Sequence, residues 1–369
     1  MRTPFTFGME EEYLLVDLDT GQVIARPKAA VIQRCREVIG PTFSEELLRS
    51  QIEVSSPIFV ELAEASEFFQ TTRQCLIKVL AADGIALYCA GSHPMARWSN
   101  QQVSAPGHYQ QLALDYRQVA QRSLVNGLHI HVGISDVDRM QLINRRLLQW
   151  LPLLQVLSTS SPFWCGKHSG YMSYRRISYR EWPNADMPEP LDNWLAYQRY
   201  EAFFQRWDDQ RDHLRWLIRP SRHFPTLELR ICDACPRLED GLCIAGLFRH
   251  LVEQCARRPL PAGPNPPELR WATQENLWRA ARFGSHGDFI VPGEQDTLDA
   301  HGWLGLLQTQ YPADTDDSER AFAHAHRIID QGTSAHHQLD AYKQAKAQDL
   351  SDAQALRAVV EQVLAQTRV

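Results

Sequence analysis

Residues 5–17 read FTFGMEEEYLLVD and predict a β-strand that carries two carboxylates on one face. Side chains alternate along an extended chain, so Glu10 and Glu12 point to the same side, with their α-carbons about 6.6 Å apart. At that separation two negative charges repel by about 0.6 kcal/mol in water and by about 2.5 kcal/mol at an effective dielectric constant near 20. A solvent-facing strand tolerates this repulsion, whereas a pocket needs a cation to offset it. The pair alone leaves both interpretations open.

Three later segments, residues 51–54, 128–134 and 223–233, repeat this alternation of polar and apolar side chains. The polar residues that share a face within them are Gln51 and Glu53, His129 and His131, and Thr226, Glu228 and Arg230. Histidines at i and i+2 on a strand present nitrogens to a metal or a phosphate, although satisfied core histidines also occur with this spacing. Solvent faces drift toward Lys, Ser and Gln, whereas these faces hold Glu, His and Arg. The four segments together favour a shared polar funnel.

Composition excludes several classes of function. The chain has 369 residues, of which 44% are hydrophobic and 22% are charged, and its net charge of −6 includes no long basic run. Nucleic-acid and membrane partners are therefore not expected. The N-terminus lacks an apolar signal core and no window is long enough to span a bilayer, so we expect a cytoplasmic protein. Cys232 and Cys235 form a single CxxC, and without a second pair they are interpreted as ordinary buried thiols.

The length allows one large single-core domain or two modest ones. We expect a single domain over residues 1–369, with sheet-forming strands mainly within 1–235 and mostly helices over 240–369 that cover the sheet. Helical spacing predicts helices near 28–38, 62–79, 109–124, 140–159 and 194–203. Asp136 or Asp138 is positioned to cap the fourth of these helices, and Asp192 the fifth. His93 follows the strand predicted over 85–90 at a turn, where a surface role is the commoner explanation.

Several acids with one or two histidines form an oxygen-dominated site, which suits Mg²⁺ or Mn²⁺ better than zinc. Magnesium often accompanies phosphate, and Arg230 beside Glu228 would supply a fixed positive fork for a phosphoryl group. The motifs GxxxxGK[ST], GxGxxG and HExxH are absent. ATP would therefore be held through metal-bridged phosphates on a sheet rather than by a glycine loop. Arg175 and Arg176 are a second candidate clamp for an anion, although solvated arginines are commoner.

Seven segments together resemble the type 2 glutamate-cysteine ligase family of ATP-dependent carboxylate-amine ligases. They are FGMEEEYLLVD, RSQIEVSSP, GLHIHVG, SPFWCGKHSGYMSYR, IRPSRHFPTLELRICD, ENLWRAARFG and GTSA, and they span nearly the whole chain. The resemblance implies an α+β fold of the glutamine synthetase and guanidino kinase type. In this fold an antiparallel β-sheet forms a funnel and helices pack on its outer face.

The resemblance also implies roles for individual residues. The positions that match the metal ligands of the family are Glu10, Glu12, Glu53, His129 and Glu228. Arg230 matches the contact to the γ-phosphate, with Arg219 assisting it, and His131, Arg175 and His223 fall in motifs that contact substrate or ATP. Asn276, Arg279 and Arg282 match a helical motif that packing explains equally well. The family often has GTSADR where this chain has GTSAHH, so the resemblance does not extend to a substrate contact by that Asp-Arg pair.

We therefore expect an ATP-dependent ligase that forms an amide through an acyl phosphate, with glutamate as the carboxylate and cysteine as the amine. The expected cofactors are ATP and Mg²⁺ or Mn²⁺, the partners are small-molecule substrates, and a homodimer is compatible with the sequence. One alternative is a metal-dependent hydrolase that uses HxH and carboxylates, which would turn over without ATP. A second alternative is a non-catalytic binder on the same fold, which would bind nucleotide without releasing ADP.

Overall fold

The fold is built on an antiparallel sheet that collects the four predicted segments. The structure is a computed structural model that describes residues 5–206, 214–258, 267–292 and 296–368. Its main sheet has seven strands in the order β2-β3-β1-β5-β9-β8, with β4 also paired to β1, and every pairing is antiparallel. The strands are β1 (Phe7–Asp17), β2 (Phe43–Glu45), β3 (Gln51–Ser55), β4 (Ile85–Tyr88), β5 (Gly127–Gly133), β8 (Ile218–Pro220) and β9 (Thr226–Asp233). The antiparallel sheet confirms the predicted architecture.

The register of the sheet brings the polar faces of the strands together. Glu12 on β1 lies opposite Glu53 on β3, and Glu10 lies opposite His129 on β5. On the other side of β5, His131 lies opposite Glu228 on β9. Because directly opposite residues in an antiparallel pair point to the same face, these side chains share one surface of the sheet.

The other face of the sheet is covered by helices α2 (Leu62–Ala81), α6 (Leu151–Ser158) and α9 (Leu238–Arg257). The strand residues that alternate with the polar ones, such as Tyr13 and Ile130, are fully buried in this core. Glu11 also points to this face, where Arg73 of α2 donates to both of its carboxylate oxygens at 2.8 and 3.0 Å. The middle acid of the Glu-Glu-Glu run is therefore neutralised inside the core.

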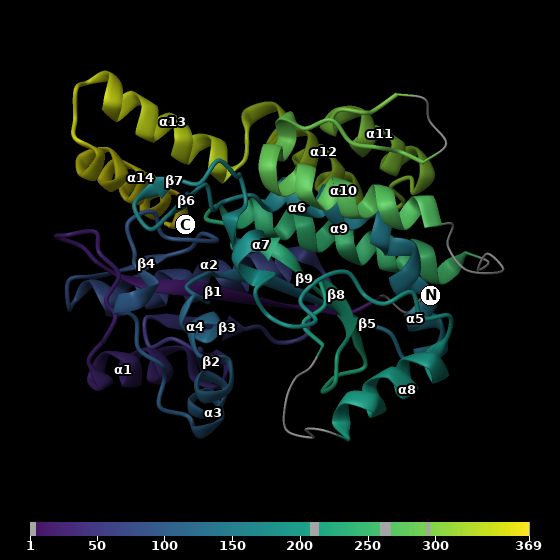
Figure 1. Ribbon diagram of the computed structural model, residues 1–369, viewed down its shortest axis with the longest axis horizontal. Helices are drawn as coiled ribbons and strands as arrows, with labels where there is room; N and C mark the ends of the chain where they lie inside the picture. Colours follow the sequence, from purple (N-terminus) through teal and green to yellow (C-terminus); the bar gives the residue numbers. More distant parts are fainter. Residues whose placement is uncertain (1–4, 207–213, 259–266, 293–295, 369) are drawn as a thin grey trace.

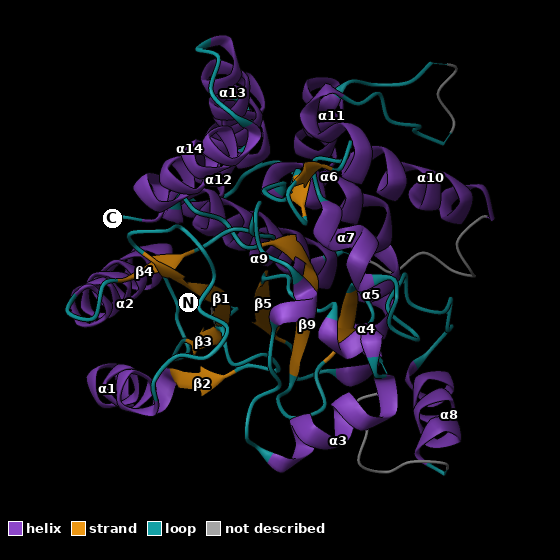
Figure 2. Cartoon of the chain, turned by 60° about the vertical axis from the view of Figure 1, so that its left-hand side comes forward, coloured by secondary structure: helices purple, strands orange, loops and turns teal. Residues whose placement is uncertain are grey.

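Further helices complete the molecule. α12 (Asp316–Gln331) packs on α9, and α10 (Pro267–Phe283) and α11 (Ala300–Gln310) pack on α6. Figures 1 and 2 both show α9 to α12 on one side of the strands and α1 (Ala29–Ile39), α3 (Gly107–Tyr116) and α8 (Trp194–Gln205) on the other. From residue 238 on, the described elements are α-helices and one 3₁₀ turn, with an isolated β-bridge between Phe289 and Leu298.

The last two helices, α13 (Ser334–Ala347) and α14 (Asp352–Thr367), pack against each other. The Cys89 backbone N–H, just after β4, donates to Thr367 Oγ1 at the end of α14, at 3.3 Å. The short strands β6 (Phe163–Trp164) and β7 (Lys167–His168) form a separate hairpin, and α7 (Tyr174–Tyr179) follows it. Among the described helices, none combines the length and the apolar character needed to cross a membrane.

Local backbone geometry divides two of the predicted helices. The segment 109–124 forms two helices, α3 and α4 (Gln118–Gln121), because Arg117 between them has a φ of 50°. The segment 140–159 is also divided, into α5 (Val137–Leu147), a 3₁₀ turn (Leu148–Trp150) and α6 with Pro152 in its first turn. Asp136 caps α5 as predicted, but Asn193 rather than Asp192 caps α8, by accepting from the backbone N–H of Ala196 at 2.9 Å.

Candidate active site

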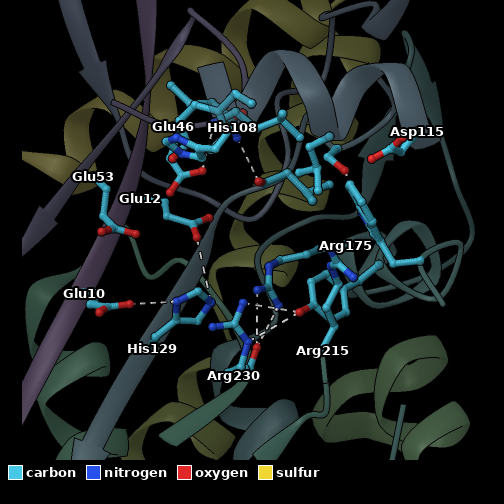
Figure 3. Close-up of a pocket in the computed structure, with 18 of the residues that line it drawn as sticks. Glu10, Glu12, Glu46, Glu53, His108, Asp115, His129, Arg175, Arg215 and Arg230 are labelled. Atoms are coloured by element: carbon cyan, nitrogen blue, oxygen red, sulfur yellow. Dashed lines mark hydrogen bonds and ion pairs between the residues drawn. The ribbon is translucent and has the colours of Figure 1, made fainter. Parts of the chain in front are cut away.

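A cavity of about 600 Å³ lies on the polar face of the sheet, and α3 and α7 supply much of its far wall. Its charge is divided between two sides. Figure 3 shows Glu10, Glu12, Glu46 and Glu53 on the left of the cavity, whereas Arg175 and Arg215 lie on the right and Arg230 below. The cavity therefore offers carboxylates to cations at one side and guanidinium groups to anions at the other.

Glu10 is the acid that both strand histidines contact. Its carboxylate lies 3.1 Å from His129 Nδ1 and 3.4 Å from His131 Nε2. Burial raises the pKa of Glu10, but the hydrogen bonds and charges of the two histidines outweigh burial and hold this pKa well below its usual range. Burial and the nearby Arg230 lower the pKa of His129 to about 4. At neutral pH the His129 ring is therefore uncharged, which is the state in which imidazole binds a metal.

Glu12, Glu46 and Glu53 form a second acidic group on the same side of the cavity. Burial raises the pKa of Glu12, partly opposed by Arg175, and burial together with Glu46 and Glu10 raises the pKa of Glu53 well above its usual range. Burial and the charge of Glu12 raise the pKa of Glu46 to about 7. These acids resist ionisation where they stand, so a cation placed among them would be strongly favoured.

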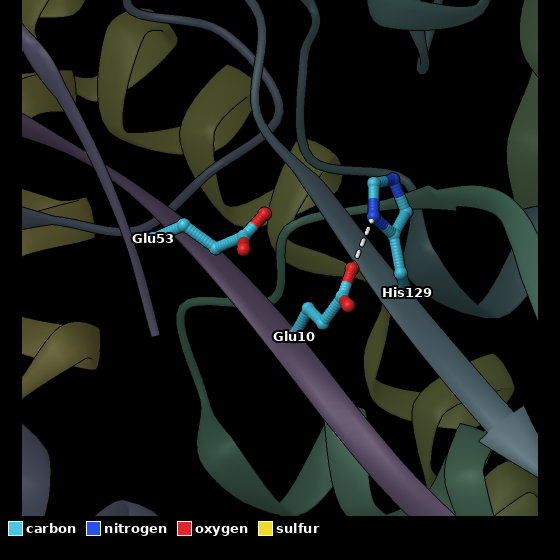
Figure 4. A group of neighbouring side chains, drawn as sticks. All are labelled: Glu10, Glu53 and His129. Atoms are coloured by element: carbon cyan, nitrogen blue, oxygen red, sulfur yellow. Dashed lines mark hydrogen bonds and ion pairs between the residues drawn. The ribbon is translucent and has the colours of Figure 1, made fainter. Parts of the chain in front are cut away.

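Three sets of these side chains have the composition and spacing of divalent-cation sites. They are Glu10, Glu53 and His129 (Figure 4); Glu10, His131 and Glu228; and Glu12, Glu46 and Glu53, and in each set the ligand atoms lie within 4.8 Å of one another. The buried Nε2 atoms of His129 and His131 make no hydrogen bond to any described residue, although they lie 3.8 Å from Glu12 Oε1 and 3.4 Å from Glu10 Oε1, respectively. A buried nitrogen that lacks a hydrogen bond is costly, and a metal ion held by that nitrogen and the neighbouring carboxylate would satisfy it. The carboxylates and histidines of these three sets thus fit Mg²⁺ or Mn²⁺.

Glu228 holds two arginines at the base of the cavity. Arg219 Nε donates to Glu228 Oε2 at 2.7 Å, and Arg230 Nη1 donates to Glu228 Oε1. Burial raises the pKa of Glu228, but the two guanidinium charges outweigh it and keep this pKa far below its usual range. The Tyr179 hydroxyl accepts from Arg230 Nε and Nη2, each at 3.4 Å. Of Arg219, Glu228 and Arg230, only Arg230 lines the cavity, and Arg219 is linked to Arg230 through Glu228.

Arg175 reaches the cavity from the first turn of α7, and buried hydroxyl groups fix the start of that helix. The Arg175 backbone N–H donates to Ser161 Oγ at 3.0 Å, and Ser161 Oγ in turn donates to Asp233 of β9 at 2.7 Å. The guanidinium group passes close to Gly127 at the start of β5, where an added Cβ would lie 2.2 Å from Arg175 Nη2. A glycine is required at this position because any side chain would displace Arg175.

Several residues that the sequence singled out lie outside the cavity. His223 is exposed in the β8–β9 connection, and its role stays a prediction. His93 is buried against Tyr88, which corrects its interpretation as a surface residue. Asn276 of α10 exchanges hydrogen bonds of 2.8 and 2.9 Å with the backbone of Ile290, a packing role, and His336 and His337 lie on α13. All eight cysteines are free, and Cys232 and Cys235 are buried thiols.

Sequence reasoning missed several residues of the cavity wall, among them the charged residues Glu46 and Arg215. Glu46 follows β2, a strand of three residues that is too short for alternation to be recognised. Arg215 lies between α8 and β8, and only the tertiary structure brings it to Tyr116 and Trp182. The one available signal for Glu46 was its position five residues before the predicted strand at residue 51.

Comparison with known proteins places the chain in a family. Residues 6–360 match glutamate-cysteine ligase family 2 (GCS2). The chain is 54% identical over 363 residues to "Putative glutamate--cysteine ligase 2" of Pseudomonas putida, with 98% of each chain covered. It is 53% identical over 369 residues to the protein of the same name from Pseudomonas entomophila, with 99% of this chain and 97% of the relative covered.

Solved structures support the fold. A glutamate-cysteine ligase of Francisella tularensis in complex with AMP superimposes with a TM-score of 0.71 at 12% identity, covering 100% of this chain and 89% of that one. A bifunctional glutathione synthetase of Pasteurella multocida gives a TM-score of 0.70 at 17% identity, covering 98% of this chain and 52% of that one. Neither the family nor these relatives support the hydrolase alternative. The chain therefore belongs to glutamate-cysteine ligase family 2 and is an ATP-dependent carboxylate-amine ligase.

Proposed function

We propose that this enzyme joins the γ-carboxylate of glutamate to the amine of cysteine, with ATP and Mg²⁺, in the cavity between the sheet and α7. The names of its close relatives support the choice of substrates. The observation that carries the proposal is the convergence of three carboxylate-rich groups with Arg230 in a single site. This combination suits phosphoryl transfer, in which catalysis consists mainly of positioning and charge stabilisation.

In this proposal the divalent ions are held by Glu10, Glu12, Glu53, His129 and Glu228, as the sequence predicts, with Glu46 and His131 completing the three groups. When bound, Mg²⁺ would neutralise phosphate charge. Mn²⁺ would suit the same oxygen and imidazole ligands. The rigid sheet keeps these ligands in place, because Glu10, Glu12, His129 and Glu228 all lie on paired strands.

Arg230 binds the transferring phosphoryl group, and Glu228 and Tyr179 fix its orientation. Arg219 shares Glu228 and so positions Arg230. A glutamate carboxylate oxygen attacks the γ-phosphorus of ATP, and ADP leaves. The cysteine nitrogen then attacks the acyl carbon of the acyl phosphate, the phosphate leaves, and the nitrogen loses a proton to give the amide. Arg175 is assigned to contacts with substrate or ATP. His131 and His223, which do not line the cavity, keep the same assignment as predictions from the sequence, and for His131 it is the alternative to a role as a metal ligand.

The proposal treats residues 1–369 as one catalytic domain, because one hydrophobic cluster runs from Phe7 of β1 to Ile329 of α12. A cytoplasmic location and a homodimer stay predictions from the sequence.

The test is ADP release by the purified enzyme with ATP and Mg²⁺, screened across amino acids singly and in pairs, with the amide identified by mass spectrometry. We expect release that requires both glutamate and cysteine and stops on chelation of the metal. Amide hydrolysis without ATP would favour a hydrolase instead. Nucleotide binding without ADP release for any pair would favour a binding protein.

A further inference from the structure

Arg215 occupies an unusual position in the cavity wall. It lies three residues before the start of β8, and its side chain lies among aromatic rings. The guanidinium carbon is 4.4 Å from the centre of the Trp182 ring and 5.2 Å from that of Tyr116. The Trp182 indole N–H donates to Ser123 Oγ at 2.7 Å, which fixes the ring against which Arg215 packs. The arginine is therefore held in place by stacking.

Arg215 differs from the other arginines that line the cavity because no residue that the structure describes accepts a hydrogen bond from its guanidinium group. Arg219 and Arg230 donate to Glu228, and Arg175 Nη1 donates to the Ile231 carbonyl at 3.2 Å. Arg215 makes neither a hydrogen bond nor an ion pair with any residue that the structure describes, although it is only 9% exposed and its Nη1 atom is buried. A guanidinium group has five N–H donors, and burying it unpaired is costly. Stacking on aromatic rings recovers only part of that cost.

A buried guanidinium group without a hydrogen-bond acceptor is suited to bind a planar anion. Two of its N–H groups can donate parallel hydrogen bonds to the two oxygens of one carboxylate. The reacting carboxylate and the phosphates of ATP belong near Arg230 and the acidic groups, if the proposed function holds. In Figure 3 Arg215 lies across the cavity from Glu10 and Glu53. We propose that Arg215 binds the carboxylate of an amino-acid substrate that does not take part in the reaction. This inference rests on the proposed function and makes amino acids, rather than simple acids or amines, the preferred substrates.

The carboxylate comes from one of two sources, the α-carboxylate of the donor glutamate or the carboxylate of the acceptor cysteine. Kinetics with decarboxylated analogues separates them. ADP release is measured for wild type, Arg215→Met and Arg215→Lys with three pairs: glutamate and cysteine, glutamate and cysteamine, and 4-aminobutyrate and cysteine. Arg258, which stacks on Tyr311 at 4.5 Å and does not line the cavity, provides the matched control Arg258→Met.

We expect Arg215→Met to raise the KM of one amino acid by about 10- to 100-fold, the usual effect of losing a charged hydrogen bond, with a smaller change in kcat. If the acceptor is the source, the variant and wild type use cysteamine equally well. If the donor is the source, they use 4-aminobutyrate equally well. Arg215→Lys keeps the positive charge but cannot donate two parallel hydrogen bonds, so its KM should lie between those of wild type and Arg215→Met. The control Arg258→Met should have the KM of wild type. An unchanged KM, or the same loss with all three pairs, would overturn the inference.

A wild-type enzyme that releases no ADP with glutamate and cysteine would refute the proposed substrates, but Arg215 is still testable. Calorimetric titration of wild type with amino acids and with their decarboxylated counterparts then gives the answer. Preference for the amino acid that disappears in Arg215→Met supports the inference. The absence of such a preference, or its persistence in the variant, refutes it.

Discussion

Replacement of Glu46 by glutamine tests whether the acidic group of the cavity is assembled for a cation. Glu46 lies with Glu12 and Glu53 in a set whose ligand atoms are within 4.8 Å of one another. Two unit charges at 4.8 Å repel by about 3.5 kcal/mol at an effective dielectric constant near 20. Burial, and after it the charge of Glu12, raise the pKa of Glu46 from 4.5 to about 7, which corresponds to about 3 kcal/mol. Burial and charge repulsion therefore both oppose ionisation of this side chain in the folded protein when no cation is bound.

The sign of the effect depends on pH and metal. Because the folded-state pKa is raised, wild type loses stability as pH rises from about 4.5 to about 7. In EDTA at pH 8, Glu46→Gln should therefore be more stable than wild type by up to about 3 kcal/mol. At pH 4.5 the difference should vanish. Saturating Mg²⁺ should stabilise wild type more than the variant, because binding to the folded state alone raises stability.

Thermal unfolding in EDTA and in Mg²⁺, at both pH values, measures these differences. Glu45→Gln is the matched control, because the neighbouring Glu45 pairs with Arg36 at 2.7 Å on the surface and its loss should change stability by no more than about 0.5 kcal/mol. The reasoning is refuted if Glu46→Gln is no more stable than wild type in EDTA at pH 8. It is equally refuted if Mg²⁺ stabilises the variant as much as wild type.

Three further predictions concern the base of the cavity and the core. Arg230→Ala should lower kcat by at least about 10³-fold while the thermal midpoint stays near that of wild type, and full activity would refute its role. Arg73→Met should lower the free energy of unfolding by about 3–5 kcal/mol, because it leaves Glu11 charged and buried, and a loss below about 1 kcal/mol in denaturant titration would contradict this. Burial lowers the pKa of His93 to about 3, so the folded state resists protonation and wild type should lose about 2 kcal/mol between pH 6.5 and pH 5. His93→Asn should not show this loss of stability. If the free energy of unfolding of wild type and His93→Asn changes with pH in the same way, the prediction is wrong.

The sheet and much of the site could be predicted because alternation along a strand is a local property. Glu10 and Glu12 on β1 face the cavity while Glu11 faces the core, as the alternation in residues 5–17 requires. Pairing of distant strands is not local, so the contact of Glu10 with His129 followed only from the resemblance to a known family. Arg117 illustrates a different limit. Its positive φ divides a helix that apolar spacing alone makes continuous.

The residues that sequence reasoning missed depend on tertiary contacts. Glu46 belongs to the site because β2 pairs with β3 and brings the following residue to Glu53. Arg215 is recognisable only when Tyr116 and Trp182, from separate segments, are seen to enclose it. Neither residue has a periodic pattern around it, and both face the cavity from loops.

Binding of Mn²⁺, measured by titration with electron paramagnetic resonance detection for wild type and Glu10→Gln, tests the central claim most directly, since Glu10 belongs to two of the three candidate metal groups. If these side chains form a cation site, wild type binds Mn²⁺ in the presence of ATP. Glu10→Gln, which should remain folded, then binds Mn²⁺ at least about 10-fold more weakly. Equal affinity in the two proteins, or the absence of binding by wild type, would contradict the account.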